Sequence, residues 1–135
     1  MLPITTESLR VFLHVLAATL WVGGQLTLAA LVPALRGSGA EVTRVAARAF
    51  NRVAWPAYAV LVVTGVWNVL AEWGEAGADW RATVYAKSGL VVASGVSAYL
   101  HTRATSRRGL AVWGAASGLT ALATLFVGVL LGVNH

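Results

Sequence analysis

Several residues of this chain could bind a cofactor although they stand within or beside long apolar stretches. Ionisable side chains inside a membrane-spanning segment are costly and often mark a functional site. A histidine imidazole can ligate a metal or carry a proton, and a tryptophan can line a flat ligand. The candidate cofactor-binding residues are His14, Lys87, Trp21, Asn68 and His101, and the candidate metal ligands are His14 and His135.

The elements that must position these residues are long apolar helices. The chain has 135 residues, of which 58% are hydrophobic and 11% are charged, and a soluble domain carries about twice that charged fraction. A helix needs roughly 20 apolar residues to cross the hydrocarbon core of a bilayer. The sequence therefore predicts an all-α integral membrane four-helix bundle, a single domain over residues 1–135, with helices at about 8–35, 53–73, 82–104 and 109–134.

Most basic residues gather in two connections, and this asymmetry predicts an orientation. One group follows the first apolar stretch and the other lies between the third and fourth: Arg36, Arg44, Arg48 and Arg52, then Arg103, Arg107 and Arg108. Cytoplasmic loops of membrane proteins carry the Lys/Arg excess. We therefore expect a multi-pass protein of the cell's inner (plasma) membrane with both termini outside. Segment 41–52 has arginines on one face, and we expect it to lie along the cytoplasmic surface before the second helix turns in.

In this orientation several polar residues reach similar depths. At 1.5 Å per residue, His14 lies about 9 Å below the outer boundary, and Lys87 lies at about the same depth. Asn68 falls in the outer third, and His135 lies close to the surface above them. His101 is about 21 Å deeper than Lys87, so it belongs to a different site. The depths predict an outward-facing site centred on His14.

Each candidate also has a purely structural interpretation. Lys87 could extend to the headgroups, His101 could lie at the inner interface, and Trp21 could be buried packing. The chain has no cysteine and its one methionine is Met1, so it lacks soft ligands for copper(I). The net charge of +5 is explained by arginines beside anionic lipid, so the bilayer is the expected partner rather than nucleic acid. Small residues at packing spacing fit a homodimer or a larger membrane complex.

The first helix carries a motif of a known kind. His14, Trp21, Gly23, Gly24, Pro33 and Arg36 form H-x6-W-x-G-G-x8-P-x2-R. This motif resembles the start of copper-resistance D (CopD) type membrane proteins. Together with His14, the stretch from Lys87 to His101 also resembles the HemJ-type protoporphyrinogen oxidases, small four-helix membrane proteins that have a helix-1 histidine and a helix-3 lysine and are linked to haem b.

These resemblances leave haem b or a copper ion as the cofactor. The CopD-like hypothesis is copper or metal handling, with His14 as main ligand and His135 or Asn68 assisting. The HemJ-like hypothesis is a haem b or porphyrin redox protein passing electrons to quinone, in which Lys87 pairs a propionate and Trp21 or Trp67 lines the ring. As an enzyme it would be a membrane oxidoreductase acting on a porphyrinogen or a quinone. A third hypothesis is a non-enzymatic accessory subunit of a larger membrane complex.

Overall fold

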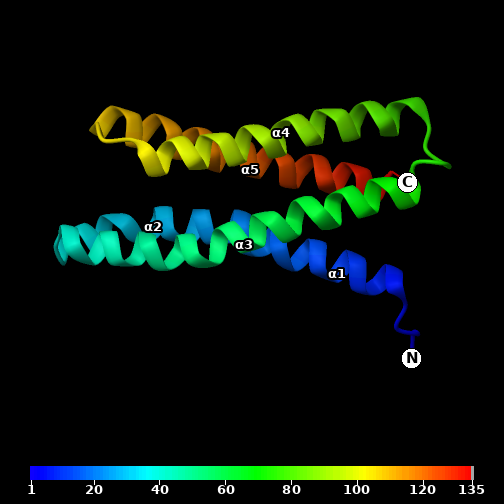
Figure 1. The fold of residues 1–135 in the computed structure, drawn as a ribbon, viewed down its shortest axis with the longest axis horizontal. Helices are drawn as coiled ribbons and strands as arrows, with labels where there is room; N and C mark the ends of the chain where they lie inside the picture. Colours follow the sequence, from blue (N-terminus) through cyan, green and yellow to red (C-terminus); the bar gives the residue numbers. More distant parts are fainter. Residues whose placement is uncertain (135) are drawn as a thin grey trace. The chain divides into compact units, whose positions relative to one another are not determined.

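The computed structural model describes residues 1–134, and across this range the chain is helical apart from its ends and short connections. Figure 1 shows the elements in chain order. They are α1 (Thr6–Ala18), the π-helical segment η1 (Thr19–Gly23), α2 (Gly24–Gly37), α3 (Ala40–Glu72), α4 (Ala78–Arg103) and α5 (Arg107–Val133). The segments α1, η1 and α2 follow one another without a break, so residues 6–134 contain four long helices. The predicted all-α fold is confirmed.

Helix length and composition agree with a membrane protein. In the part of the chain that the structure describes, three helices are long and apolar enough to cross a bilayer: Thr6–Gly37, Ala40–Glu72 and Arg107–Val133. Helix α4 has 26 residues and is long enough, but it includes Asp79, Arg81 and Lys87 and is more polar. The fourth span at 82–104 therefore stays a prediction.

The chain divides into two compact units, Met1–Asn68 and Val69–His135, with the boundary inside α3. Each unit is a pair of antiparallel helices. We call the first unit the first hairpin and the second unit the second hairpin. In each, the turn end is where the two helices connect, and the open end is opposite. The predicted single domain over 1–135 stays a prediction.

Side-chain contacts define the register of the first hairpin. The Trp21 ring lies 4.6 Å from the Tyr58 ring, centroid to centroid, and His14 Nδ1 lies 2.9 Å from Thr64 Oγ1. The earlier residue, His14, pairs with the later residue of α3, and the later residue, Trp21, pairs with the earlier one. The two helices are therefore antiparallel. One turn beyond the His14–Thr64 pair, this register places Arg10 of α1 opposite residue 68 of α3.

The connection between α2 and α3 corrects one prediction. It consists of Ser38 and Gly39, and Gly39 adopts a φ of +109°, a conformation that glycine accepts without steric cost. Helix α3 then runs unbroken from Ala40 to Glu72, so segment 41–52 is the first part of α3 and not a separate element. The predicted turn into the membrane near residue 53 is wrong, because residues 40–52 contain neither glycine nor proline to end the helix.

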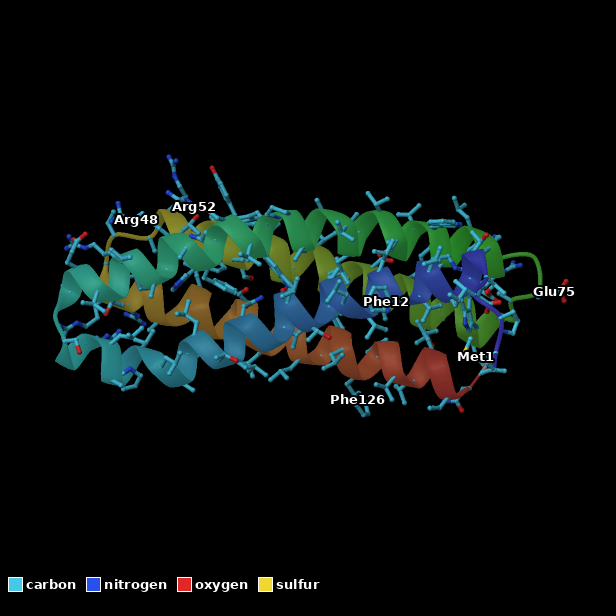
Figure 2. All side chains as sticks on the ribbon, turned by 90° about the horizontal axis from the view of Figure 1, so that it is seen from below. Met1, Phe12, Arg48, Arg52, Glu75 and Phe126 are labelled. Atoms are coloured by element: carbon cyan, nitrogen blue, oxygen red, sulfur yellow. The ribbon has the colours of Figure 1, made fainter. Side chains whose placement is uncertain are left out.

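Charged side chains of this first part of α3 point away from the hairpin. Figure 2 shows Arg48 and Arg52 directed outward from the ribbon. Glu41 forms ion pairs with Arg48 at 3.2 Å and with Arg44 at 3.7 Å, and all three side chains are exposed. Exposed ion pairs of this kind contribute little to stability. The arginines of α3 therefore belong to a solvated or headgroup-facing surface rather than to the core.

Small polar residues form the interface of the second hairpin. Ser94 Oγ donates to the Ser117 carbonyl at 3.4 Å, and Ser117 Oγ donates to the Ser94 carbonyl at 3.3 Å. Ser97 and Thr124 are buried as well. Small side chains and shared hydroxyl hydrogen bonds allow close approach of helices in a bilayer. This register brings Lys87 of α4 opposite Thr124 of α5.

Aromatic packing fastens the α3–α4 connection to the start of α4. The Trp73 ring lies 6.4 Å from Trp80 and 6.0 Å from Tyr85, centroid to centroid. Arg81 stacks over Trp73 at 4.9 Å from the ring centroid, and its Nη2 donates to the Trp73 carbonyl at 3.0 Å. Glu75 extends from the tip of this connection in Figure 2. The tryptophans are therefore part of a structural cluster.

Candidate functional site

The hydrogen bond between His14 and Thr64 determines the tautomer of the imidazole. Thr64 Oγ1 lies 2.6 Å from the Val60 carbonyl, which can only accept, so the one hydroxyl hydrogen is donated there. Thr64 Oγ1 must then accept from His14 Nδ1, 2.9 Å away. We therefore assign the proton of the neutral imidazole to Nδ1 and the lone pair to Nε2. This arrangement is typical of metal-binding histidines, whose other ring nitrogen donates to a neighbouring group.

Gly65 provides room for the imidazole. A Cβ atom at position 65 would lie 3.3 Å from His14 Cε1, closer than an ordinary van der Waals contact. The ring is thus held on one side by the backbone of α3 and at Nδ1 by a side chain of α3. The position of His14 depends on both helices of the first hairpin.

Arg10 is a site residue that the sequence analysis missed. It lies four residues before His14, so the two share a face of α1. Ala17 and Trp21 continue this face. Arg10, Ala17 and Trp21 are buried, with Arg10 only 6% exposed, whereas His14 is half-buried. The spacing to His14 was the signal that could have identified it. The burial of Arg10 could not be known from the sequence.

Asn68 completes the polar cluster at the open end of the first hairpin. It lies one turn beyond Thr64 on α3 and is half-buried. The register places it opposite Arg10, as Thr64 is opposite His14. We refer to Arg10, His14, Thr64 and Asn68 as the His14 cluster.

Trp21 lies in η1, further toward the turn end than His14. Its ring is 3% exposed and packs against Tyr58, and against Trp55 at 5.4 Å between centroids. These contacts are ordinary aromatic packing. π-Helical segments occur often at functional sites, and η1 begins five residues after His14. The predicted role of Trp21 as a wall for a flat ligand stays a prediction.

Lys87 lies against a glycine of α5 in the second hairpin. A Cβ atom at position 128 would be 3.1 Å from Lys87 Nζ, so Gly128 makes room for the ammonium group. The register sets Lys87 opposite Thr124, and Gly128 is one turn further toward the open end. The side chain therefore extends along α5 toward the open end of its own hairpin.

His101 lies at the turn end of the second hairpin. Its Nδ1 donates to the Leu110 carbonyl at 2.9 Å, and a Cβ atom at position 114 would lie 3.0 Å from its Cε1. Fourteen residues of α4 separate it from Lys87, which is about 21 Å along a helix. The predicted separation of His101 from Lys87 follows from this continuous helix. The contacts of His101 tie the end of α4 to the start of α5.

The structure thus gathers some candidates and separates others. His14, Trp21 and Asn68 belong to the first hairpin, whereas Lys87 and His101 belong to the second. The predicted common site of His14 and Lys87 stays a prediction, and His135 lies outside the described residues. Within residues 1–134, no group of three or more His, Asp or Glu side chains could hold a metal ion. In the His14 cluster, His14 is the one imidazole that could ligate a metal.

Comparison with protein-family models, with curated proteins and with solved structures finds no match. The CopD-like and HemJ-like resemblances therefore depend on the motif residues alone.

Proposed function

We propose that this chain is a haem b-binding membrane protein with a redox function, in which His14 ligates the iron through Nε2. The observation that carries the proposal is the His14–Thr64 hydrogen bond, because it directs the lone pair to Nε2. One histidine is sufficient for five-coordinate haem. A tight copper(II) site would ordinarily need more imidazole or carboxylate ligands than the His14 cluster provides.

The charge of Arg10 also favours haem over a bare divalent ion. Side chains at positions i and i+4 of a helix have Cβ atoms about 5–6 Å apart. A divalent ion bound at His14 and the positive charge of Arg10 would repel each other. In haem, the porphyrin neutralises most of the charge of the iron, so the same arginine imposes a smaller cost.

In the membrane we place four spans, with both termini outside and both arginine-rich turns in the cytoplasm. This orientation puts the His14 cluster at the outer side. The haem there would exchange electrons with a quinone or a porphyrinogen that arrives through the outer leaflet. Homodimers and larger membrane complexes are both compatible with the small-residue surfaces of α5.

The visible spectrum and metal content of the purified protein test the proposal. We expect a Soret band that His14→Ala abolishes and that His101→Ala, a matched change in the second hairpin, leaves in place. A colourless protein with stoichiometric copper that depends on His14 would instead support copper handling. A colourless protein without metal would support the accessory-subunit hypothesis, and a Soret band unchanged in His14→Ala would place the haem elsewhere.

A further inference from the structure

We infer that three arginines of α3, Arg44, Arg48 and Arg52, form a surface that binds anionic phospholipid headgroups of the bilayer that the first hairpin spans. We call these residues the arginine stripe. The stripe lies at the turn end of the first hairpin, whereas the His14 cluster lies at its open end. Lipid binding at the stripe therefore does not depend on the proposed haem function.

The three arginines share one exposed face of α3. They repeat every four residues, and side chains at this spacing lie on one side of a helix. The side chains of Arg44 and Arg48 are 72% and 66% exposed, and Arg52 is exposed as well. Figure 2 shows Arg48 and Arg52 directed away from the ribbon. A phosphate can therefore reach the guanidinium groups from outside the protein and pair with them through two parallel hydrogen bonds.

The register of the first hairpin places the stripe at one boundary of the hydrocarbon core. The apolar stretch of the first helix begins at Val11, and a crossing of about 20 residues ends near Ala30. In the register set by the contact between His14 and Thr64, Ala30 is about level with Arg48. The other two arginines lie one turn to either side, about 6 Å away. The headgroup layer is about 5–8 Å deep, so all three side chains can reach headgroup phosphates.

An exposed apolar strip beside the stripe favours a lipid over a soluble anion. Val42, Val45 and Val53 are 41%, 54% and 51% exposed. At about 100° per residue, they lie on the face of α3 next to the arginines. Basic side chains beside an exposed apolar strip are typical of helical segments at a membrane surface, where acyl chains cover the apolar residues. A soluble phosphate compound would leave these valines in water.

Glu41 lowers the positive charge of the stripe. Its carboxylate pairs with Arg48 at 3.2 Å and with Arg44 at 3.7 Å. Exposed ion pairs of this kind are weak, so headgroup phosphates can replace the carboxylate at both arginines. Glu41 therefore competes with the lipid for the stripe.

The lipid preference of the full-length protein tests the inference. Ala49→Cys gives the chain a single cysteine beside the stripe, and this cysteine is labelled with a fluorophore. The protein is reconstituted in phosphatidylcholine vesicles that contain a trace of either phosphatidylglycerol or phosphatidylcholine with a nitroxide near the headgroup. We expect phosphatidylglycerol to quench the fluorophore more strongly, and this preference to fall when the salt concentration is raised from about 0.1 M to about 1 M.

Substitutions in the labelled protein show which charges matter. We expect Arg48→Gln and Arg52→Gln each to lower the preference for phosphatidylglycerol by about fivefold, the effect of one basic residue near an anionic surface. Glu41→Gln should raise the preference. Arg36→Gln is the matched control, since it removes the same charge from α2 outside the stripe, and it should have little effect. The substituted side chains are exposed, and circular dichroism checks that the helices remain intact.

Two results would overturn the inference. One is equal quenching by the two lipids when the stripe is intact. The other is an equal loss of preference in Arg36→Gln and Arg48→Gln, which would show that total charge rather than the stripe attracts the lipid. His14→Ala should leave the preference unchanged, so the lipid surface and the proposed haem function can fail separately.

Discussion

Thr64 controls the ligand chemistry of His14 through its single hydroxyl hydrogen. That hydrogen is donated to the Val60 carbonyl, so toward the imidazole Thr64 is an acceptor. Serine could do the same, whereas valine has the same shape and no acceptor. The residue that would matter for the proposed iron site is therefore one whose type alone suggests no chemistry.

Replacing Thr64 should weaken haem binding without unfolding the hairpin. We expect Thr64→Val to lower haem affinity by about 10- to 100-fold, the usual cost of losing the partner of a ligating histidine, with a shifted Soret band. Thr64→Ser should remain close to wild type. Equal affinities for the valine and serine variants would show that the hydrogen bond does not orient the ligand.

Gly114 should be far less tolerant of alanine than its neighbour Gly118. An alanine at 114 would press on the His101 ring, whereas nothing lies within 4 Å of a Cβ at 118. We expect Gly114→Ala to lower the free energy of unfolding by about 1–3 kcal/mol, measured by denaturant titration in mixed micelles. Gly118→Ala should be neutral or gain up to about 1 kcal/mol from helix propensity. Adding His101→Ala should relieve part of the loss at position 114.

At the scale of elements, α2 and α3 meet through a ring packed against a glycine. A Cβ atom at position 24 would overlap the Phe50 ring, whereas nothing lies within 4 Å of one at Gly23. We expect Gly24→Ala to destabilise the protein by about 1–3 kcal/mol and Gly23→Ala to have little effect. Thermal unfolding followed by circular dichroism would measure both. Phe50→Leu combined with Gly24→Ala should restore part of the stability, and a failure to do so would mean that the ring is not what excludes alanine.

The sequence predicted most helices well and α3 poorly, for a physical reason. Apolar length predicted a first helix over 8–35 and a last over 109–134, and these run from Thr6 to Gly37 and from Arg107 to Val133. The start of α3 was missed because its arginines suggested a segment lying on the membrane surface. Residues 40–52 contain neither glycine nor proline, so nothing in this segment ends the helix, and Phe50 within it packs against α2.

The site was predictable in part. His14 was identified because an imidazole inside an apolar stretch is costly, and Asn68 because of its calculated depth. Thr64 could not be identified, since it lies 50 positions from His14 in the sequence and threonine is common in helices that pack in membranes. The burial of Arg10 likewise depends on tertiary packing rather than on any local pattern.

At the scale of the whole molecule, the orientation can be tested directly because the chain has no cysteine. Ser38→Cys and Thr105→Cys lie at the two turn ends, and Glu75→Cys lies in the α3–α4 connection. In intact cells we expect a membrane-impermeant maleimide to label position 75 and to label 38 and 105 only after lysis. The opposite pattern would invert the orientation and move the His14 cluster to the cytoplasmic side.

The division of the chain at Asn68 also has a consequence for biogenesis. All members of the His14 cluster lie within the first 68 residues, and His14 meets Thr64 only when the second helix of the first hairpin pairs with the first. During synthesis, the hydrogen bond that selects the His14 tautomer can therefore form only after α3 has been made. The first hairpin, which holds all residues of the proposed ligand site, is therefore synthesised before the second.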